Sequence, residues 1–358
     1  MRRAFHGGSF FEAIGPRLDA LDLAERIVSA DVLDAWFDPA PAVTEALAEH
    51  LPFLLKTSPP THAEGLTEVI SEVRNIGKER IIVGAGSSDL IFLLFPYLDS
   101  RTLILDPMYG EYSFILESVV GCDVVRHFLD PQQGFRLCLK ELATTIERER
   151  PAVVTLVNPN SPTGHYVHRE GLIELIDRFP QVQFVIDEAY VDFVDRTLSL
   201  ETVSRSNLIV IKSLSKVYAL SGVRAAYMVA PPQLVESLAP KCPPWSVSLP
   251  AQLAAIKALQ SQDYYDARYL ETHLYREEFV AWLKEERFDV INDCANFILL
   301  EVDEAERVCA LAKESGVYLR NCDSMSSRFS GQYLRIAVKA PAMNIRILEA
   351  LKRCRVSC

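Results

Sequence analysis

The sequence lacks the long apolar segments and the basic surface charge that mark membrane proteins and nucleic-acid-binding proteins. None of its apolar runs reaches the roughly 18 residues that a transmembrane helix needs, and no apolar stretch of the signal-peptide type follows the basic N-terminus. The 358 residues carry a net charge of −11, with the basic residues scattered along the chain. This balance disfavours binding to nucleic acid. We therefore expect a cytoplasmic protein that has neither a membrane nor a nucleic acid as its partner.

Paired cysteines and grouped metal ligands are missing as well. The eight cysteines are spread along the chain without a Cys-x-x-Cys pair, as is typical of small core residues in a reducing compartment. His165 and His168 have a spacing that metal sites use, but no cysteine or carboxylate ligands are grouped with them. We interpret this segment as a solvated loop and predict no metal site.

Short apolar runs and amphipathic stretches alternate from about residue 79 to residue 230. Continuous Val, Ile and Leu strands separated by helices predict a mostly parallel sheet that is covered on both faces. The predicted strands are residues 80–83, 102–105, 123–127, 152–157, 183–186, 208–211 and 225–229. The predicted helices between them are residues 88–98, 111–120, 139–148 and 169–179.

A proline-rich break at residues 231–244 precedes a second, smaller α+β region. We expect an α/β protein with a large domain at residues 40–240, built on a mostly parallel seven-stranded sheet between helices, and a small substrate-covering domain formed by residues 1–39 and 241–358. The elements predicted after the break are a helical stretch at 251–286, strands at 296–302, 317–320 and 333–338, and helices at 304–315 and 343–353.

A glycine loop, residues 84–89, joins the first predicted strand to the first predicted helix. Such a turn directs free backbone N–H groups and a helix N-terminus at an anion, commonly a phosphate. A dinucleotide fingerprint is the alternative, since Gly84 and Gly86 fit Gly-x-Gly and Asp106 falls at a later strand end. However, Asp89 occupies the third glycine position, where a side chain obstructs close packing of helix on strand. The nicotinamide interpretation therefore stays a distant alternative.

Three further segments place polar or aromatic groups just beyond strand ends. Tyr109 can stack on a planar heterocycle, although an ordinary turn tyrosine is an equally good interpretation. Residues 158–164 form a rigid loop of prolines, amides and hydroxyls. Asp187 ends an apolar strand, where a carboxylate is costly unless it is paired. A pyridinium N–H would pair it, while a helix N-cap is the alternative role.

The most informative segment, residues 213–224, follows the strand predicted at 208–211. It carries a single lysine, Lys216, flanked by hydroxyls, with Arg224 eight residues further on. An amine can form a Schiff base with an aldehyde, and hydroxyls with a guanidinium can hold a phosphate. Taken alone, the segment fits an ordinary solvated turn equally well.

A phosphate loop, a stacking aromatic, a polar loop, a buried acid and a lysine thus follow one another at strand ends, where open α/β sheets bind ligands. These are the parts that hold pyridoxal phosphate. In motif order, residues 79–352 resemble the fold-type-I pyridoxal-phosphate enzymes of aminotransferase class I and II. The resemblance is strongest to the histidinol-phosphate aminotransferases and the threonine-phosphate decarboxylases.

This resemblance implies a role for each residue of the predicted site. Lys216 would be the Schiff-base lysine and proton shuttle, Asp187 would pair with the ring nitrogen, and Tyr190 would hydrogen-bond the phenolic oxygen. Tyr109 would stack on the ring. The residues implied to hold the phosphate are Gly86, Ser87, Ser88, Ser213, Ser215 and Arg224.

The resemblance also implies three substrate contacts. Arg335 matches the arginine that grips the substrate α-carboxylate, for which a bidentate guanidinium is the natural partner. Arg320 matches an arginine that meets a phosphate or another second anion on the substrate. A surface ion pair is the alternative for each arginine. Trp36 lies in the N-terminal segment, residues 33–39, that covers the substrate in the family.

Several departures from the family pattern leave the substrate open. Ser161 stands where relatives usually have asparagine before Pro-Thr-Gly, so either Asn160 or Ser161 must reach the phenolic oxygen. The glycine loop has Ala85 in place of a frequent asparagine, and residues 57–62 lack the tyrosine that crosses the dimer interface in relatives. Two short segments, residues 6–8 and 320–322, favour the decarboxylase branch.

We therefore predict a homodimeric pyridoxal-phosphate aminotransferase that acts on an amino acid or a phosphorylated derivative of one. Lys216 would move the proton that leaves Cα. The alternative reaction is α-decarboxylation, which differs only in the Cα bond that stands perpendicular to the ring. A cofactor-binding sensor without activity is a third interpretation, and the presence of Lys216, Asp187 and Arg335 together argues against it.

Overall fold

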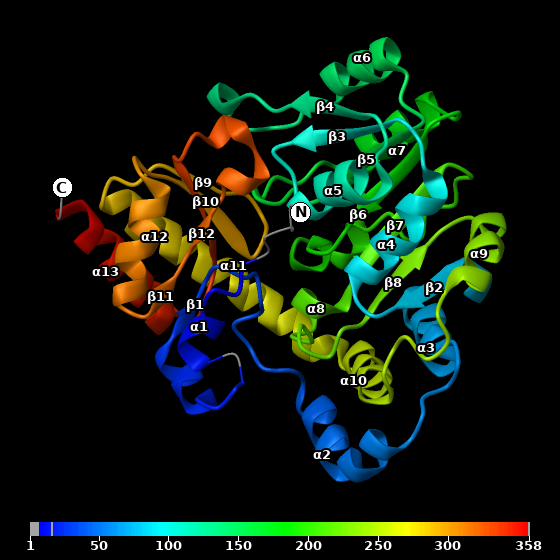
Figure 1. Cartoon of the computed structure of the whole chain (residues 1–358), viewed down its shortest axis with the longest axis horizontal. Helices are drawn as coiled ribbons and strands as arrows, with labels where there is room; N and C mark the ends of the chain where they lie inside the picture. Colours follow the sequence, from blue (N-terminus) through cyan, green and yellow to red (C-terminus); the bar gives the residue numbers. More distant parts are fainter. Residues whose placement is uncertain (1–6, 16, 357–358) are drawn as a thin grey trace.

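A seven-stranded sheet forms the larger part of the molecule in the computed structural model, which describes residues 7–15 and 17–356 (Figure 1). The strand order is β2-β8-β7-β6-β5-β3-β4. Strand β8 is antiparallel to both neighbours, and the pairs from β7 to β4 are parallel, so the predicted mostly parallel sheet is confirmed. The strands are β2 (Ile81–Gly84), β3 (Thr102–Asp106), β4 (Val124–Phe128), β5 (Val153–Val157), β6 (Gln183–Asp187), β7 (Leu208–Ser213) and β8 (Ala226–Val229).

Helices cover both faces of this sheet. Every residue of β3, β5, β7 and β8 is buried, as expected of strands that have no solvent-facing side. The helix predicted at residues 111–120 is instead a short α-helix that continues into a π-helical turn. The covering elements are α4 (Ser87–Leu98), α5 (Gly110–Phe114), the π-turn η3 (Ile115–Val120), α6 (Leu139–Glu149), α7 (Arg169–Arg178), α8 (Leu214–Val217) and α9 (Pro232–Leu238).

Two helices that the sequence analysis did not predict, α2 (Pro41–Lys56) and α3 (Glu64–Arg74), pack against α10 (Leu249–Leu259). The single helical stretch predicted at 251–286 is wrong, because α10 ends before a second helix, α11 (Gln262–Glu285), begins. The Ser261 hydroxyl at the break donates to the carbonyl of Lys257, a local bond that competes with the helical pattern.

A four-stranded antiparallel sheet in the order β12-β13-β10-β9 forms the smaller part. The strand predicted at 317–320 is divided, because β11 pairs in parallel with β1 from the N-terminal segment, whereas β12 joins β13. The elements are β1 (Val28–Ser29), β9 (Val290–Ile291), β10 (Phe297–Glu301), α12 (Ala305–Glu314), β11 (Val317–Tyr318), β12 (Arg320–Asn321), β13 (Tyr333–Ala337) and α13 (Pro341–Val356). The domain limits at residues 40 and 240 stay a prediction.

His165 is not in a solvated loop. Its imidazole is buried, with Nδ1 3.2 Å from Asp293 Oδ2 and Nε2 2.7 Å from Gly134 O.

Across residues 7–15 and 17–356, the structure gathers no group of three or more metal-ligating side chains. Within the same residues, no helix has both the length and the apolar character that crossing a bilayer requires.

Candidate active site

Lys216 lies on the short helix α8, directly after the end of β7. Its Nζ is 2.6 Å from Asp34 Oδ1 and 3.4 Å from Ser221 Oγ. Burial alone would raise the pKa of Asp34, but the charge and hydrogen bond of Lys216 outweigh it and lower that pKa below its usual value. Asp34 therefore belongs to the site as a carboxylate, although the sequence analysis did not select it from residues 33–39.

Asp187 ends β6, the strand next to β7, and its side chain is buried. Its Oδ2 accepts a hydrogen bond from the Tyr112 hydroxyl at 2.7 Å, and its Oδ1 accepts one from Ala189 N at 2.9 Å. Burial raises the pKa of Asp187 despite these bonds and the charge of Lys212. A protonated ring nitrogen would give this carboxylate the cationic partner that burial demands. Tyr112 is a second site residue that the sequence analysis missed.

Tyr109 and Tyr190 are close enough to Asp187 and Arg335 that these charges act on both phenols. Burial is the largest effect and raises the pKa of each phenol above its usual value, so both stay protonated. The Tyr109 ring lies edge-on to Tyr112 with centroids 6.2 Å apart. Two neutral tyrosines thus lie near the Asp187 carboxylate, and aromatic rings of this kind can pack on a planar heterocycle.

The glycine loop and Arg224 approach one another closely. A Cβ at Gly86, where φ is +91°, would lie 2.3 Å from Arg224 Nη2, so a larger residue would displace the guanidinium and strain the backbone. Arg224 Nη1 donates to Ser215 Oγ at 3.3 Å and to Ser221 O at 3.2 Å. The two predicted sources of phosphate contacts, residues 84–89 and 213–224, thus meet at one place.

The serines predicted to hold the phosphate lie at helix starts in this same region. Ser87 and Ser88 open α4, where backbone N–H groups are free to bind an anion. Ser213 caps α8, its Oγ accepting a hydrogen bond from Ser215 N at 3.3 Å. Asp89, which conflicts with a dinucleotide fingerprint, folds back and accepts a hydrogen bond from Ala85 N at 2.9 Å. The free N–H groups at the start of α4, the serine hydroxyls and the Arg224 guanidinium are the kinds of donor that bind a phosphate.

Arg335 connects the smaller sheet to the loop at residues 158–164. Its Nη1 donates to Ser161 Oγ at 3.0 Å and its Nη2 donates to Asp31 O at 3.1 Å, while its Nε has no hydrogen-bond partner among the described residues. Asn160 Nδ2 already donates to Pro107 O and Thr163 Oγ1, at 3.2 and 3.0 Å. The Ser161 hydroxyl keeps its own proton to donate, which favours Ser161 over Asn160 as the contact to a phenolic oxygen.

Arg320 is buried on β12 and donates to Ser324 Oγ at 3.1 Å. Burial, reinforced by the charge of Arg335, lowers the pKa of Arg320 to about 10. Arg320 and Arg126 both line a cavity of about 540 Å³ that also contains several serines.

Trp36 does not line this cavity. Its indole donates to Thr272 Oγ1 at 2.8 Å on α11, and its role as a substrate contact stays a prediction.

Comparisons with known proteins agree with this geometry. The chain matches the family model of aminotransferase class I and II over residues 30–351. Histidinol-phosphate aminotransferase 2 of Archaeoglobus fulgidus is 31% identical over 353 residues, which cover 96% of this chain and 98% of that protein.

Two solved structures share the fold. Histidinol-phosphate aminotransferase from Sinorhizobium meliloti, in complex with pyridoxal-5'-phosphate, has a TM-score of 0.83 at 19% identity and covers 99% of both chains. L-threonine-O-3-phosphate decarboxylase from Porphyromonas gingivalis has a TM-score of 0.79 at 21% identity, covering 91% of this chain and 99% of that chain. The predicted fold is thereby confirmed, and the family match excludes the nicotinamide alternative. The chain belongs to the aminotransferase class I and II family and is an enzyme that uses pyridoxal phosphate.

Proposed function

We propose that the protein is an aminotransferase for a phosphorylated amino acid derivative and that Lys216 is the residue that binds the cofactor aldehyde. The observation that carries this proposal is the placement of Asp187 and Lys216 at the ends of two neighbouring parallel strands, with Asp187 in register with Ile211. The relative from Archaeoglobus fulgidus, named as a histidinol-phosphate aminotransferase, supports the substrate class.

When bound, pyridoxal phosphate supplies an electron sink for the bonds at Cα. In this proposal Asp187 keeps the ring nitrogen protonated, because its carboxylate is buried and forms no ion pair with the described residues, although the charge of Lys212 acts on it. Lys216 Nζ would accept the proton that leaves the substrate Cα and would donate it again later in the reaction. Arg335 binds the substrate α-carboxylate, using the Nε that has no partner among the described residues.

A second anionic group on the substrate is supported by the cavity that Arg320 lines. Arg126 lies on the same cavity, together with the hydroxyls of Ser324 and Ser326. Guanidinium and hydroxyl groups are the donors that proteins use for phosphate. The cavity is also lined by the carboxylates of Asp106, Glu117 and Asp323. Arg126 pairs with both Asp106 and Glu117, so the proposal of an anion here depends on Arg320.

The alternative reaction, α-decarboxylation, is favoured by residues 6–8 and 320–322. His6 lies outside the described residues. The test incubates holoenzyme with histidinol phosphate or threonine phosphate, with and without a 2-oxo acid acceptor. Amino transfer to the acceptor supports the proposal. Release of carbon dioxide from threonine phosphate, which unlike histidinol phosphate carries an α-carboxylate, without an acceptor overturns it in favour of decarboxylation.

The lysine assignment has its own test. Lys216→Ala should abolish the visible absorbance that borohydride reduces, because no other amine would be bonded to the aldehyde. Lys78→Ala, which removes an exposed lysine from η2 (Lys78–Arg80), is the matched control and should keep the band. Survival of the band in Lys216→Ala would show that another residue binds the cofactor.

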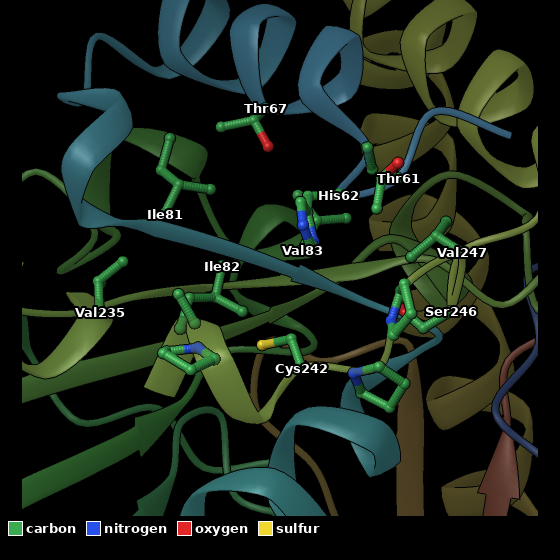
Figure 2. A pocket seen from close by; sticks show the side chains of 15 residues that line it. Thr61, His62, Thr67, Ile81, Ile82, Val83, Val235, Cys242, Ser246 and Val247 are labelled. Carbon is green, nitrogen blue, oxygen red and sulfur yellow. The ribbon is translucent and has the colours of Figure 1, made fainter. Parts of the chain in front are cut away.

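We also propose that the active protein is a cytoplasmic homodimer. Helix α2 exposes three large apolar side chains, those of Leu51, Phe53 and Leu55, and Trp245 is exposed as well. A cavity of about 520 Å³ is lined by Thr61, His62 and residues of β2, and Figure 2 shows these side chains. Thr61 and His62 lie in residues 57–62, the segment in which relatives carry the tyrosine that crosses the dimer interface, so a second copy is the proposed neighbour of this cavity. Sedimentation equilibrium should give twice the chain mass, and a monomer that retains full activity would contradict the proposal.

A further inference from the structure

Lys216 lies on a helix that is too short to hold its own backbone in place. Helix α8 has four residues, Leu214–Val217, which is about one turn. The last carbonyls of a helix have no partner within it, so the backbone around Lys216 depends on groups from other segments. The Lys216 side chain is 23% exposed, so packing alone does not fix its direction either.

The residue before Lys216 is held by the segment that follows the helix. The Ser215 carbonyl accepts hydrogen bonds from Leu220 N at 2.9 Å and from Ser221 Oγ at 3.2 Å. The Ser215 hydroxyl accepts one from Arg224 Nη1 at 3.3 Å. One side of Lys216 is therefore anchored in the region where the cofactor phosphate is proposed to bind.

The residue after Lys216 is held by the long helix α11. The hydroxyl of Tyr269 donates to the carbonyl of Val217, the last residue of α8, at 2.9 Å. Burial raises the pKa of the Tyr269 phenol well above its usual value, so the hydroxyl keeps the proton that it donates. The Tyr269 ring packs edge-on against Phe193, with centroids 5.1 Å apart, which fixes the position of the hydroxyl. The proposed mechanism does not use this tyrosine.

The next residue along the chain, Tyr218, is held on two sides. Its buried hydroxyl accepts a hydrogen bond from Arg74 Nη2 at 2.7 Å and donates one to Gln262 Oε1 at 3.1 Å. Arg74 ends α3 and Gln262 begins α11. The chain that leaves Lys216 is thus tied to two further helices, and α11 contributes a contact to each of the two residues that follow the lysine.

We propose that Tyr269 is a positioning residue, which fixes through the Val217 carbonyl the direction in which the Lys216 side chain leaves α8. This inference rests on the proposed role of Lys216 as the amine that binds the cofactor aldehyde. When Lys216 Nζ bonds to the aldehyde carbon, water leaves and the side chain is confined to one direction. A backbone that is already fixed loses less conformational entropy at this step. Tyr269 therefore strengthens the covalent attachment of the cofactor rather than the binding of its ring or phosphate.

The test compares two forms of the cofactor that differ only at the reactive carbon. Pyridoxal phosphate can bond to Lys216, whereas pyridoxine 5'-phosphate carries an alcohol at that carbon and cannot. Tyr269→Phe keeps the ring and its packing but removes the donor. It should raise the dissociation constant of pyridoxal phosphate about fivefold and that of pyridoxine phosphate less than about twofold, because only the aldehyde requires an ordered lysine. Calorimetric titration of apoenzyme measures both constants.

Two further variants complete the comparison. Tyr264→Phe is the matched control, since Tyr264 lies on the same helix and its hydroxyl also donates to a backbone carbonyl, that of Asp38 at 2.9 Å, which is not part of α8. It should leave both dissociation constants unchanged. Tyr218→Phe removes the hydroxyl that joins Arg74 to Gln262, and should show the same selective loss for pyridoxal phosphate as Tyr269→Phe.

A purely structural role would weaken the binding of both cofactor forms equally in Tyr269→Phe, and this result overturns the inference, as does unchanged affinity for both. If circular dichroism shows that Tyr269→Phe does not fold, Tyr218→Phe decides by the same comparison. Failure of the proposed function is distinguishable, because Lys216→Ala would then keep the wild-type preference for pyridoxal phosphate over pyridoxine phosphate. Loss of that preference in Lys216→Ala, together with a selective loss in Tyr269→Phe, supports the inference.

Discussion

Tyr112 donates its hydroxyl proton to Asp187 Oδ2 at 2.7 Å, and both side chains are buried. Tyr112 lies on α5, which follows β3, whereas Asp187 ends β6, and β5 separates these two strands in the sheet. The bond therefore connects the ends of strands that are not neighbours. Because Ala189 N holds the other carboxylate oxygen, the orientation of Asp187 is set by the protein itself.

Tyr112→Phe should weaken pyridoxal phosphate binding about tenfold, because a hydrogen bond to a buried charged group contributes about 1.5 kcal/mol. Absorbance titration of apoenzyme measures the affinity. Tyr265→Phe is the matched control, since the Tyr265 hydroxyl is buried but accepts from Ala40 N at 3.0 Å, away from Asp187. Equal affinities in the two variants would show that Tyr112 does not support the carboxylate.

Gly86→Ala should raise the dissociation constant for pyridoxal phosphate at least about tenfold. The new Cβ would lie 2.3 Å from Arg224 Nη2, and a side chain at φ +91° adds backbone strain of about 1–3 kcal/mol. The guanidinium must then leave the glycine loop. Gly65→Ala is the control, because a Cβ there meets nothing within 4 Å, and it should bind the cofactor as the wild-type protein does. Wild-type affinity in Gly86→Ala would show that the glycine loop and Arg224 do not hold the cofactor phosphate together.

The central sheet was predictable because each strand is a short apolar run bounded by polar or turn residues. Every strand of the seven begins within one residue of its predicted start, as β3 at Thr102 and β6 at Gln183 illustrate. Residues that end a strand or follow it closely, such as Asp187 and Lys216, could be selected from these predicted strands, because the ends of parallel strands meet at one edge of the sheet.

Contacts between distant segments could not be predicted in this way. Asp34 meets Lys216 across 182 residues of sequence, and Tyr112 meets Asp187 across 75 residues. No local pattern encodes either pairing. Helix α2 escaped prediction for another reason, because it buries Leu54 while exposing Phe53 and Leu55, so apolar residues occur on more than one side and the helical period is obscured.

Lys212→Met should lower the free energy of unfolding of the apoenzyme by about 3–5 kcal/mol, because it leaves buried carboxylates without their cation. Lys212 Nζ is 2.8 Å from Asp192 Oδ1 and 3.5 Å from Glu188 Oε2, and none of these side chains is more than 3% exposed. Urea unfolding measures the change. Lys78→Met removes an exposed ion pair with Glu68 and should leave stability nearly unchanged. Similar losses in both variants would contradict the argument.

Glu188 makes stability depend on pH in a direction that can be worked out. Burial, its largest influence, raises the pKa of Glu188 to about 7, whereas the same group in an unfolded chain has its ordinary pKa of 4.5. Between these values the folded state binds the proton more tightly, so this group's contribution to stability falls as pH rises and is constant above about 7. Over this pH range the contribution of Glu188 to the free energy of unfolding falls by about 3 kcal/mol.

Glu188→Gln cannot titrate at this position. Its free energy of unfolding should therefore rise by about 3 kcal/mol relative to that of the wild-type protein between about pH 4.5 and pH 7.5, in addition to any effect of the substitution that does not depend on pH. Urea unfolding of both apoenzymes across this range measures the difference. Glu68→Gln, on an exposed pair, is the control and should show no such trend. A difference between Glu188→Gln and wild type that stays constant with pH would mean that Glu188 is ionised throughout, with Lys212 compensating fully for its burial.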